Sequence, residues 1–329
     1  MRKKTQNIAR VIEILADGNF HSGEVLGEEL GVSRTAVSQY MKELAKFGLD
    51  VFRVTGKGYR LAKPLQLLDL DAINRALAKG SGAAAPVVHL ERVVSSTNDL
   101  LKDRLTGVIE SGATVLAEAQ TQGRGRRGKA WLSPFGSNLY MSMYWRLEQG
   151  MAAAMGLSIA LGAALAQLFE QEGIYGVELK WPNDVLVGGR KIAGILIELE
   201  GQAVGPAHAI VGIGINLQTP DWFLNEVEQP WTDVQRLLNK PINRNMWATK
   251  LVACCHKTIK EYEQTGLSPF LKRWHKYDRL AMQPVKIIMG DKEIVGIAEG
   301  IDENGALLLK REGKLERYHA GEVSLRYGI

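Results

Sequence analysis

The residues best suited to chemistry in this 329-residue sequence form a loop rich in glycine and arginine. Residues 123–128 read Gly-Arg-Gly-Arg-Arg-Gly, with Gln120 shortly before them and Trp131 shortly after. The glycines allow a close backbone approach and positive φ angles, and the arginines offer forked donors that suit carboxylates and phosphates. The segment lacks the Gly-Lys-Ser/Thr ending of a P-loop. It therefore predicts another kind of anion-binding loop, and the alternative is a flexible basic loop that binds nucleic acid without specificity.

Two lysines and an acid are predicted to converge at one end of a pair of strands. Lys180 ends an apolar strand and is followed by Trp-Pro-Asn and then Asp184. Gly188 and Gly189 supply a hairpin turn, and the returning strand carries Lys191 back to the same end. A lysine on a strand of high apolar content must face a partner, because its burial without one is costly. This pattern favours an anion site over a solvated surface.

Polar side chains also open a predicted helix. Residues 87–94 read as a strand, and Ser96, Thr97 and Asn98 follow it at the helix start. Hydroxyl and amide side chains in this place are common helix caps. They can equally donate to and accept from a neutral polar ligand, so both readings stay open.

Another apolar strand, predicted over residues 209–215, ends in Asn216, whose amide can read the edge of a nucleotide base. The residues that follow, 217–231, have little periodicity and contain two prolines. Long connections of this kind are often functional lids. We therefore expect a mobile lid that ends at Trp231.

Three domains are expected to position these groups. From about 65 to 275, short apolar runs alternate with helical patterns, which predicts a mixed α/β domain around a sheet. Residues 282–329 contain short strands with turn residues every few positions, which predicts a small β-barrel. Residues 1–63 form the remaining domain, and Pro64 begins a linker.

The N-terminal domain has the pattern of a winged helix. A first amphipathic helix precedes two helices that Ser22 and Ser33 can cap, and Gly31 turns the chain between them. Two short strands around a glycine turn then form the wing. The side chains predicted to contact DNA are Arg34, Thr35, Ser38, Gln39, Lys42, Arg53 and Lys57.

The distribution of charge supports this reading of the N-terminus. The chain has a formal net charge of +5, and its first 63 residues hold eleven Lys and Arg against seven Asp and Glu. A basic excess permits nucleic-acid binding without proving it. The alternative is a small helical protein-interaction module whose basic residues form only a solvated face.

Composition limits the class and the location. A content of 46% hydrophobic and 23% charged residues is that of a soluble globular protein, and no window is expected to reach the roughly 20 apolar residues of a membrane helix. The basic N-terminus lacks the apolar core of a signal peptide. Cys254 and Cys255 are adjacent and have no metal-ligand spacing. We therefore predict a cytoplasmic protein with reduced thiols, no contact with a membrane and no metal site of its own.

The glycine-arginine loop with Trp131, together with the Lys-Trp-Pro-Asn-Asp segment, resembles the motifs of biotin protein ligases of the bifunctional repressor type, and the resemblance extends along nearly the whole chain. It implies an α+β multidomain fold, in which a ligase domain with a class II synthetase-like mixed sheet lies between a winged helix and an SH3-like barrel. Biotin and ATP would give biotinyl-5′-adenylate, and a lysine of the biotin carboxyl carrier protein of acetyl-CoA carboxylase would then attack it. The adenylate-bound homodimer would bind operator DNA and repress biotin synthesis.

The resemblance also implies roles for individual residues. The catalytic residues would be Lys191, Arg126 and Lys180. Biotin would be bound by Ser96, Thr97, Asn98, Gln120, Arg124, Gly125, Arg126 and Lys191. ATP and the adenylate would be bound by Arg124, Arg126, Arg127, Trp131, Asp184, Asn216 and Trp231.

Two implications concern other parts of the site. Arg317 and its neighbours in the barrel would reach toward the ATP site or help to order it. Mg²⁺ is expected with ATP, and because no cluster of carboxylates has metal-site spacing, the phosphates would be its main ligands. The poorest match to the family is the lid segment 217–231.

Two other functions remain open at this stage. One is a non-enzymatic winged-helix repressor that only senses biotin, and the other is a related acyl ligase such as a lipoate ligase. The arginine loop with Lys180 and Lys191 disfavours a pure sensor. The attached winged helix and the loop motif disfavour a lipoate enzyme.

Overall fold

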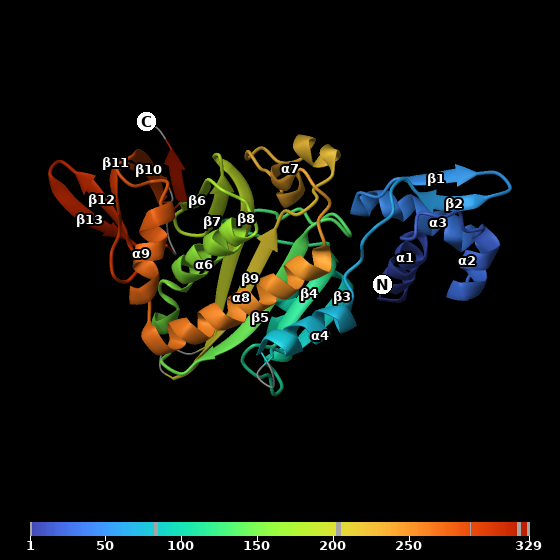
Figure 1. Cartoon of the computed structure of the whole chain (residues 1–329), viewed down its shortest axis with the longest axis horizontal. Coiled ribbons are helices and arrows are strands. Elements are labelled where there is room, and N and C mark those ends of the chain that lie inside the picture. Colours follow the sequence, from blue (N-terminus) through green and yellow to red (C-terminus); the bar gives the residue numbers. More distant parts are fainter. Residues whose placement is uncertain (1, 82–84, 202–204, 290, 321–323, 328–329) are drawn as a thin grey trace.

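The computed structural model describes residues 2–81, 85–201, 205–289, 291–320 and 324–327. Its helices and strands form three parts in chain order, with the N-terminal part at one end of the molecule and the C-terminal part at the other (Figure 1). The predicted order of a helical N-terminus, a central mixed sheet and a C-terminal antiparallel sheet is confirmed.

The N-terminal part is a helix-turn-helix with a two-stranded wing. Its elements are α1 (Arg2–Leu15), α2 (Gly23–Leu30), α3 (Arg34–Leu44), the short helix η1 (Ala45–Phe47), β1 (Val51–Val54) and β2 (Gly58–Leu61). Ser22 and Ser33 each accept a hydrogen bond from a backbone N–H in the first turn of α2 and of α3, so both predicted caps are confirmed. Gly31 ends α2 with a left-handed backbone, a conformation that favours glycine.

The central part is built on a seven-stranded sheet in the order β3-β4-β5-β9-β8-β7-β6. Its strands are β3 (Val88–Val94), β4 (Thr114–Gln120), β5 (Leu139–Leu147), β6 (Val177–Lys180), β7 (Asp184–Val187), β8 (Arg190–Gly201) and β9 (Ala207–Ile215). β3 and β4 are parallel, and the other neighbours are antiparallel. The mixed sheet predicted from the alternating pattern is therefore confirmed.

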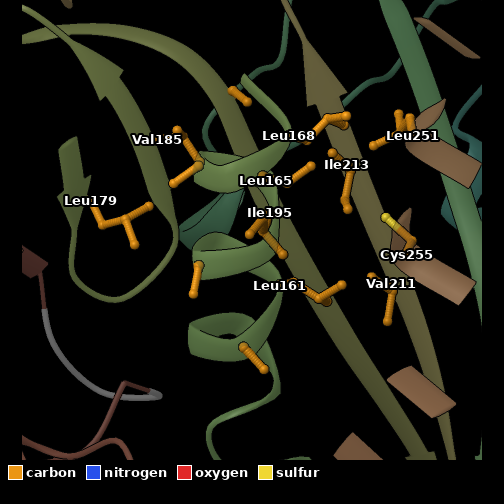
Figure 2. Close-up of a cluster of buried hydrophobic side chains, with 14 of the residues drawn as sticks. Leu161, Leu165, Leu168, Leu179, Val185, Ile195, Val211, Ile213, Leu251 and Cys255 are labelled. Carbon is orange, nitrogen blue, oxygen red and sulfur yellow. The ribbon is translucent and has the colours of Figure 1, made fainter. Parts of the chain in front are cut away.

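Helices cover one face of this sheet and bury the main core against it. They are α4 (Leu70–Ser81), α6 (Leu157–Gln171), α8 (Arg244–Thr265) and α9 (Ser268–Tyr277). Figure 2 shows Leu161, Leu165 and Leu168 of α6 lying among apolar side chains of the strands and of α8. The other face carries α5 (Thr97–Arg104), and the shorter elements are η3 (Arg126–Gly128), η4 (Met151–Ala154), η5 (Asp221–Asn225) and α7 (Val234–Leu238).

One expectation about apolar segments was wrong. Residues Met151–Gln171, which include α6, are long and apolar enough to pass a test for a membrane helix. They pass because α6 contacts the sheet on one side and other helices on the other, so it is apolar nearly all round. A helix of this kind is typical of the interior of a large domain.

The C-terminal part is a five-stranded antiparallel sheet in the order β13-β12-β11-β10-β14. Its strands are β10 (Pro284–Met289), β11 (Lys292–Ile301), β12 (Leu307–Arg311), β13 (Lys314–Tyr318) and β14 (Ser324–Tyr327). The two predicted turn or strand positions Gly290 and Val323 lie outside the described residues. Trp181 donates from Nε1 to the carbonyl of Gly305 at 3.0 Å, which ties this part to the central sheet.

The winged helix contacts the central part directly. Glu13 of α1 accepts from Arg92 of β3 at 2.6 Å, and Phe135 donates its N–H to the carbonyl of Phe47 at 3.1 Å. The rings of these two phenylalanines meet edge to face, 6.2 Å apart. The end of η1 is thus fixed to the segment that follows the glycine-arginine loop.

Candidate active site

The site lies on the face of the central sheet opposite α6 and α8. Side chains of a strand alternate between the two faces of a sheet. In β9, Val211, Ile213 and Ile215 point into the main core, and Gly212 and Gly214 between them lie on the other face. Gly194 of β8 pairs with Gly214. Neighbouring positions without a side chain leave a hollow in the sheet surface. These glycines were not predicted as site residues, although glycines at alternate positions of an apolar strand are a signal of such a hollow.

A cavity of about 490 Å³ lies above this hollow. It brings together all the residues predicted to be catalytic or to bind biotin and ATP. They are Ser96, Thr97, Asn98, Gln120, Arg124, Gly125, Arg126, Arg127, Trp131, Lys180, Asp184, Lys191, Asn216 and Trp231. These residues come from several segments between β3 and the residues before α7, so the fold assembles in one place what the chain keeps far apart.

The start of α5 is held by a buried polar network. Gln120 Oε1 accepts from the N–H of Thr97 at 2.9 Å and from its hydroxyl at 3.1 Å. Ser142 Oγ of β5 lies 2.7 Å from Thr97 Oγ1 and 2.5 Å from Asn98 Oδ1. Ser96 is the N-cap residue by position, but its hydroxyl makes no cap hydrogen bond. This geometry favours the ligand-binding reading of the segment over the capping one.

Two polar residues of this network were missed by sequence reasoning. One is Ser142, and the other is Glu198 of β8, which accepts from Asn98 Nδ2 at 2.6 Å. Ser142 of β5 and Leu196 of β8 lie opposite Gly212, one on each side of β9. Glu198 is two residues after Leu196, so its side chain points to the same face of the sheet as Ser142 and Asn98. No local motif marks either residue, since their place depends on the register of distant strands.

We call residues 121–131 the tongue. It folds back on itself, since Gly125 donates to the carbonyl of Lys129 at 2.7 Å and Trp131 donates to that of Gly123 at 2.8 Å. The single turn of η3 forms its tip, where Arg127 has a positive φ of 57°. The segment predicted as a flexible or anion-binding loop is therefore a hydrogen-bonded turn that overhangs the cavity.

Trp131 at the base of the tongue lies on the glycine floor. A Cβ atom at Gly214 would collide with its indole, and one at Gly194 would lie 2.9 Å from it. Lys191 Nζ is 5.2 Å from the centre of the Trp131 ring. The indole Nε1 is buried and has no hydrogen-bond partner in the described chain, a donor that a bound ligand can satisfy.

Lys191 and Asp184 face one another in the cavity. Lys191 Nζ is 2.7 Å from Asp184 Oδ1, and the two side chains are 19% and 16% exposed. The backbones of Asp184 and Lys180 lie opposite one another in the antiparallel pair of β6 and β7. The predicted convergence of two lysine positions and an acid is present, and the acid holds one ammonium group in place.

Arg126 reaches from η3 to the C-terminal part, where it donates to the carbonyl of Ala320. Burial lowers the pKa of its guanidinium, and the charge of Asp184 acts in the opposite direction. The barrel therefore touches the site through Ala320. Arg317 itself pairs with Asp302, directly after β11, at 3.3 Å and lies outside the cavity lining, so the part of the barrel that contacts the site is Ala320 and not Arg317.

Asn216 has a different setting from the one predicted. Its Nδ2 donates to the carbonyls of Lys191 and Thr232 at 3.3 and 3.2 Å. Those bonds occupy the amide donors, so the side chain holds the backbone beside Lys191 and its N–H groups do not point to a base edge. The predicted base-reading role is thus restricted to its carbonyl oxygen.

The segment 217–231 forms one wall of the cavity. Trp231 forms an isolated bridge to Lys191, its ring meets that of Phe223 edge to face at 5.0 Å, and the guanidinium of Arg236 lies 4.6 Å from its centre. Sequence reasoning missed Phe223, which also lines the cavity. The aromatic group gives the wall a flat apolar surface that suits a purine.

The predicted DNA surface lies on the exposed face of α3 and on the wing, and the other face of α3 is buried in the core of the domain. Arg34, Thr35, Gln39 and Lys42 of α3 are exposed, and Ser38 is half-buried. Arg53 and Lys57 of the wing are also exposed. The structure thus leaves these side chains accessible to a partner.

Comparison with known proteins gives the family. Residues 8–60 match the family described as HTH domain, residues 90–216 the Biotin/lipoate A/B protein ligase family, and residues 283–326 the Biotin protein ligase C terminal domain. The chain is 48% identical to the Bifunctional ligase/repressor BirA of Salmonella typhimurium and 46% identical to that of Escherichia coli, over 96% of each chain. The chain belongs to the bifunctional biotin ligase/repressor family.

A solved structure agrees with this membership. The biotin protein ligase of Aquifex aeolicus, in complex with biotin and ATP, superposes with a TM-score of 0.64 at 27% identity. The match covers 74% of this chain and 99% of that one. The predicted family and fold class are therefore confirmed, and the fold is shared with a ligase that holds both substrates.

Proposed function

We propose that this chain is an ATP-dependent biotin protein ligase and a repressor of biotin synthesis. The observation that carries the ligase role is that one cavity combines two kinds of groups. Thr97 and Asn98 offer polar contacts for the head group of biotin, and Arg126 and Lys191 offer positive charge for a carboxylate and a phosphate. A volume of about 490 Å³ is in the range of small-molecule and cofactor sites. The family membership supports both roles.

In the first step a carboxylate oxygen of biotin attacks the α-phosphorus of ATP. The bond from that phosphorus to the bridging oxygen breaks, and pyrophosphate leaves. Two anions must approach, so Lys191 and Arg126 offset their repulsion and stabilise the charge that develops. Asp184, 2.7 Å from Lys191, keeps the ammonium aimed into the cavity before the substrates enter. Lys180, at the end of β6, adds a further positive charge.

The remaining cavity residues bind and orient. Ser96, Thr97, Asn98 and Gln120, with Gly125 of the tongue, suit the neutral polar head group of biotin. Trp231 and Phe223 offer aromatic faces for adenine, and Trp131 and Arg127 close the site from the tongue. A closed tongue also excludes water, which protects a mixed anhydride from hydrolysis.

We propose that Mg²⁺ enters with ATP. The described part of the chain has no group of three side chains that could hold a metal ion. The carboxylates that line the cavity there are Asp184, which is paired with Lys191, and Glu228. This donor set fits an ion carried mainly by the phosphates, with one carboxylate at most from Asp184. When bound, the ion would neutralise part of the phosphate charge.

In the second step the amine of an acceptor lysine attacks the carbonyl carbon of biotinyl-5′-adenylate. The bond from that carbon to the phosphate oxygen breaks, AMP leaves, and the amide nitrogen loses a proton. We propose the biotin carboxyl carrier protein of acetyl-CoA carboxylase as the acceptor. A second cavity of about 380 Å³, between β8 and the C-terminal part, shares Arg126 and Asn183 with the first and offers the lysine a path.

The repressor role rests on the helix-turn-helix match and on the exposed side chains of α3 and the wing. We propose that the adenylate-bound chain forms a homodimer on two operator half-sites. In support of this, β7 pairs with β8 only as far as Gly194, so the described part of β8 beyond Leu196 has an open edge on that side. Open edges can pair with another chain. Sedimentation with and without biotinyl-5′-adenylate tests this, and identical monomer-dimer equilibria would contradict it.

One assay separates the proposed function from its alternatives. The protein is incubated with ATP, a biotin acceptor domain and either biotin or lipoate. The proposal predicts pyrophosphate release and label transfer with biotin alone. Tight biotin binding without pyrophosphate release would instead identify a sensor, and activity with lipoate would identify the related acyl ligase. Because the proposed reaction uses cytosolic metabolites, a cytoplasmic location is part of the same proposal.

A further inference from the structure

The guanidinium of Arg124 is bound by two carboxylates at the base of the tongue. Nη1 donates to Asp99 Oδ2 at 2.8 Å and Nη2 to Asp99 Oδ1 at 2.6 Å, which is a bidentate pair. Nη2 also lies 3.0 Å from both oxygens of Glu198. The Asp99 carboxylate, with help from Glu198, raises the pKa of Arg124 well above its usual value. Arg124 also lines the cavity, so its predicted contact with biotin and phosphate stays a prediction, while these bonds tie the side chain to the protein.

The two carboxylates stand outside the cavity lining, on separate elements. Asp99 belongs to the first turn of α5, and Glu198 belongs to β8. Glu198 also accepts from Asn98 Nδ2 at 2.6 Å. One arginine thus joins the tongue to both the helix that begins at the head-group site and the strand that carries Lys191.

The position of Arg124 within the tongue gives this link a consequence. Arg124 forms a bridge to Ala130, next to Trp131, so the two sides of the tongue move as one hydrogen-bonded unit. Fixing Arg124 therefore fixes Trp131 over Gly194 and Gly214. Bidentate pairs of arginine and carboxylate are the ion pairs best suited to such a fixed geometry.

We propose that Asp99 and Glu198 are positioning residues that anchor Arg124 and so hold the tongue closed over biotinyl-5′-adenylate. This rests on the proposed ligase function. The anchor acts on how long the intermediate is retained, and the chemical step is left to Arg126 and Lys191. Release of the adenylate then requires both ion pairs of Arg124 to open.

The test compares Asp99→Asn with Asp103→Asn in the full-length protein. Asp103 lies one turn further along α5, is exposed, and has no ion-pair partner in the described chain. Biotinyl-5′-adenylate is formed on the enzyme, and its release is followed by tryptophan fluorescence, since Trp131 lies in the site. We expect Asp99→Asn to speed release about tenfold, a value that allows for the partial exposure of the pair. Asp103→Asn should match the parent.

A double-mutant cycle shows whether the effect passes through Arg124. If the anchor is one unit, Arg124→Gln and the double variant with Asp99→Asn will release the adenylate at similar rates. Asp99→Glu keeps the charge and should recover part of the retention. The rate of adenylate formation should change less than about threefold in Asp99→Asn and Asp99→Glu, because Asp99 lies outside the cavity lining and the reacting groups are elsewhere.

Specific results would overturn the proposal. Equal release from Asp99→Asn and Asp103→Asn would show that the pair does not anchor the tongue, and additive effects in the cycle would show that Asp99 acts apart from Arg124. Failure of the parent protein to form any adenylate would instead refute the proposed function. A variant that unfolds is recognised by circular dichroism, and Glu198→Gln then tests the second carboxylate in the same way.

Discussion

The two faces of the central sheet show how one set of strands supports both stability and chemistry. On one face β5, β8 and β9 present large apolar side chains to α6 and α8, and Figure 2 shows those of β8 and β9 at Ile195, Val211 and Ile213. On the other, the same strands present Ser142, Glu198 and the glycines at 194, 212 and 214. The first face is filled and the second is hollow, because neighbours along a strand point to opposite sides. Changes on the two faces should therefore have separable effects.

The largest effect is expected for Lys191→Met on the hollow face. Loss of the preorganised charge that we propose for the phosphate should reduce the rate of adenylate formation about thousandfold. The free energy of unfolding should change little, since Asp184 is partly exposed. Single-turnover kinetics measure the rate, and Lys272→Met, at an exposed position of α9, is the control. A rate near that of the parent would remove Lys191 from the chemistry.

A side chain placed on the floor should act almost as strongly. In Gly214→Val the new Cβ meets the indole of Trp131, so the tongue cannot seat and the substrates are displaced. Displacements of about 1 Å can cost about a hundredfold in rate, and we expect a loss of that order. Titration with biotin alone should show weaker binding as well. Unchanged binding and rate would mean that the seating of Trp131 on Gly214 does not matter for the ligand.

Arg126→Ala should mainly shorten retention of the intermediate. The group is half-buried between Asp184 and Ala320, and loss of its charge-assisted bonds to the phosphate should speed adenylate release about thirtyfold. Arg190→Ala, exposed at the start of β8, is the matched control. Release at the parental rate would show that Arg126 does not close the site.

On the filled face, a substitution is expected to lower the free energy of unfolding and to leave the activity nearly unchanged. Ile213 lies between Gly212 and Gly214 but points into the core, where it is 2% exposed. Ile213→Ala should lower the free energy of unfolding by roughly 2–5 kcal/mol, because it leaves a cavity. Activity per folded molecule should stay within about twofold of the parent. Denaturant unfolding and an activity assay on the same sample check both. A large loss of activity per folded molecule would show that packing on the filled face also controls the active site.

The smallest effect is expected from thiol reagents. Burial raises the pKa of the Cys254 thiol to about 11, and it raises that of Cys255 on the filled face as well. At about pH 8 roughly one Cys254 thiol in a thousand is then ionised, so alkylation of the native protein should be slow. Activity should survive treatment that labels both cysteines after unfolding. Rapid labelling of the native protein would show that α8 opens readily.

Local chemistry explains how much of the site could be predicted from the sequence. The tongue and Lys191 carry residue types that few folds need for structure alone, so their place in one cavity with the start of α5 could be predicted. The same holds for the helix caps at Ser22 and Ser33, which depend on contacts three residues away. Fold class followed from such local patterns.

Long-range register explains what could not be predicted. Ser142 and Glu198 face Asn98 only because β5 and β8 pair with β9 in a particular register. Asn216 was assigned to adenine because it ends an apolar strand and because the family resemblance implies that role, but its Nδ2 donates to the carbonyls of Lys191 and Thr232. Arg124 was assigned to the ligand from the family resemblance, and no pattern in the sequence indicated that Asp99 and Glu198 would pair with its guanidinium. The role of a polar residue next to a motif can be inferred only when its partners in the folded structure are known.

The most direct test of the account is a crystal structure with a non-hydrolysable analogue of biotinyl-5′-adenylate. We expect the ring system of biotin beside Thr97 and Asn98, the phosphate mimic within hydrogen-bond distance of Lys191 Nζ, and the adenine against Trp231. An analogue bound away from the glycine floor, with Lys191 still paired only to Asp184, would contradict it.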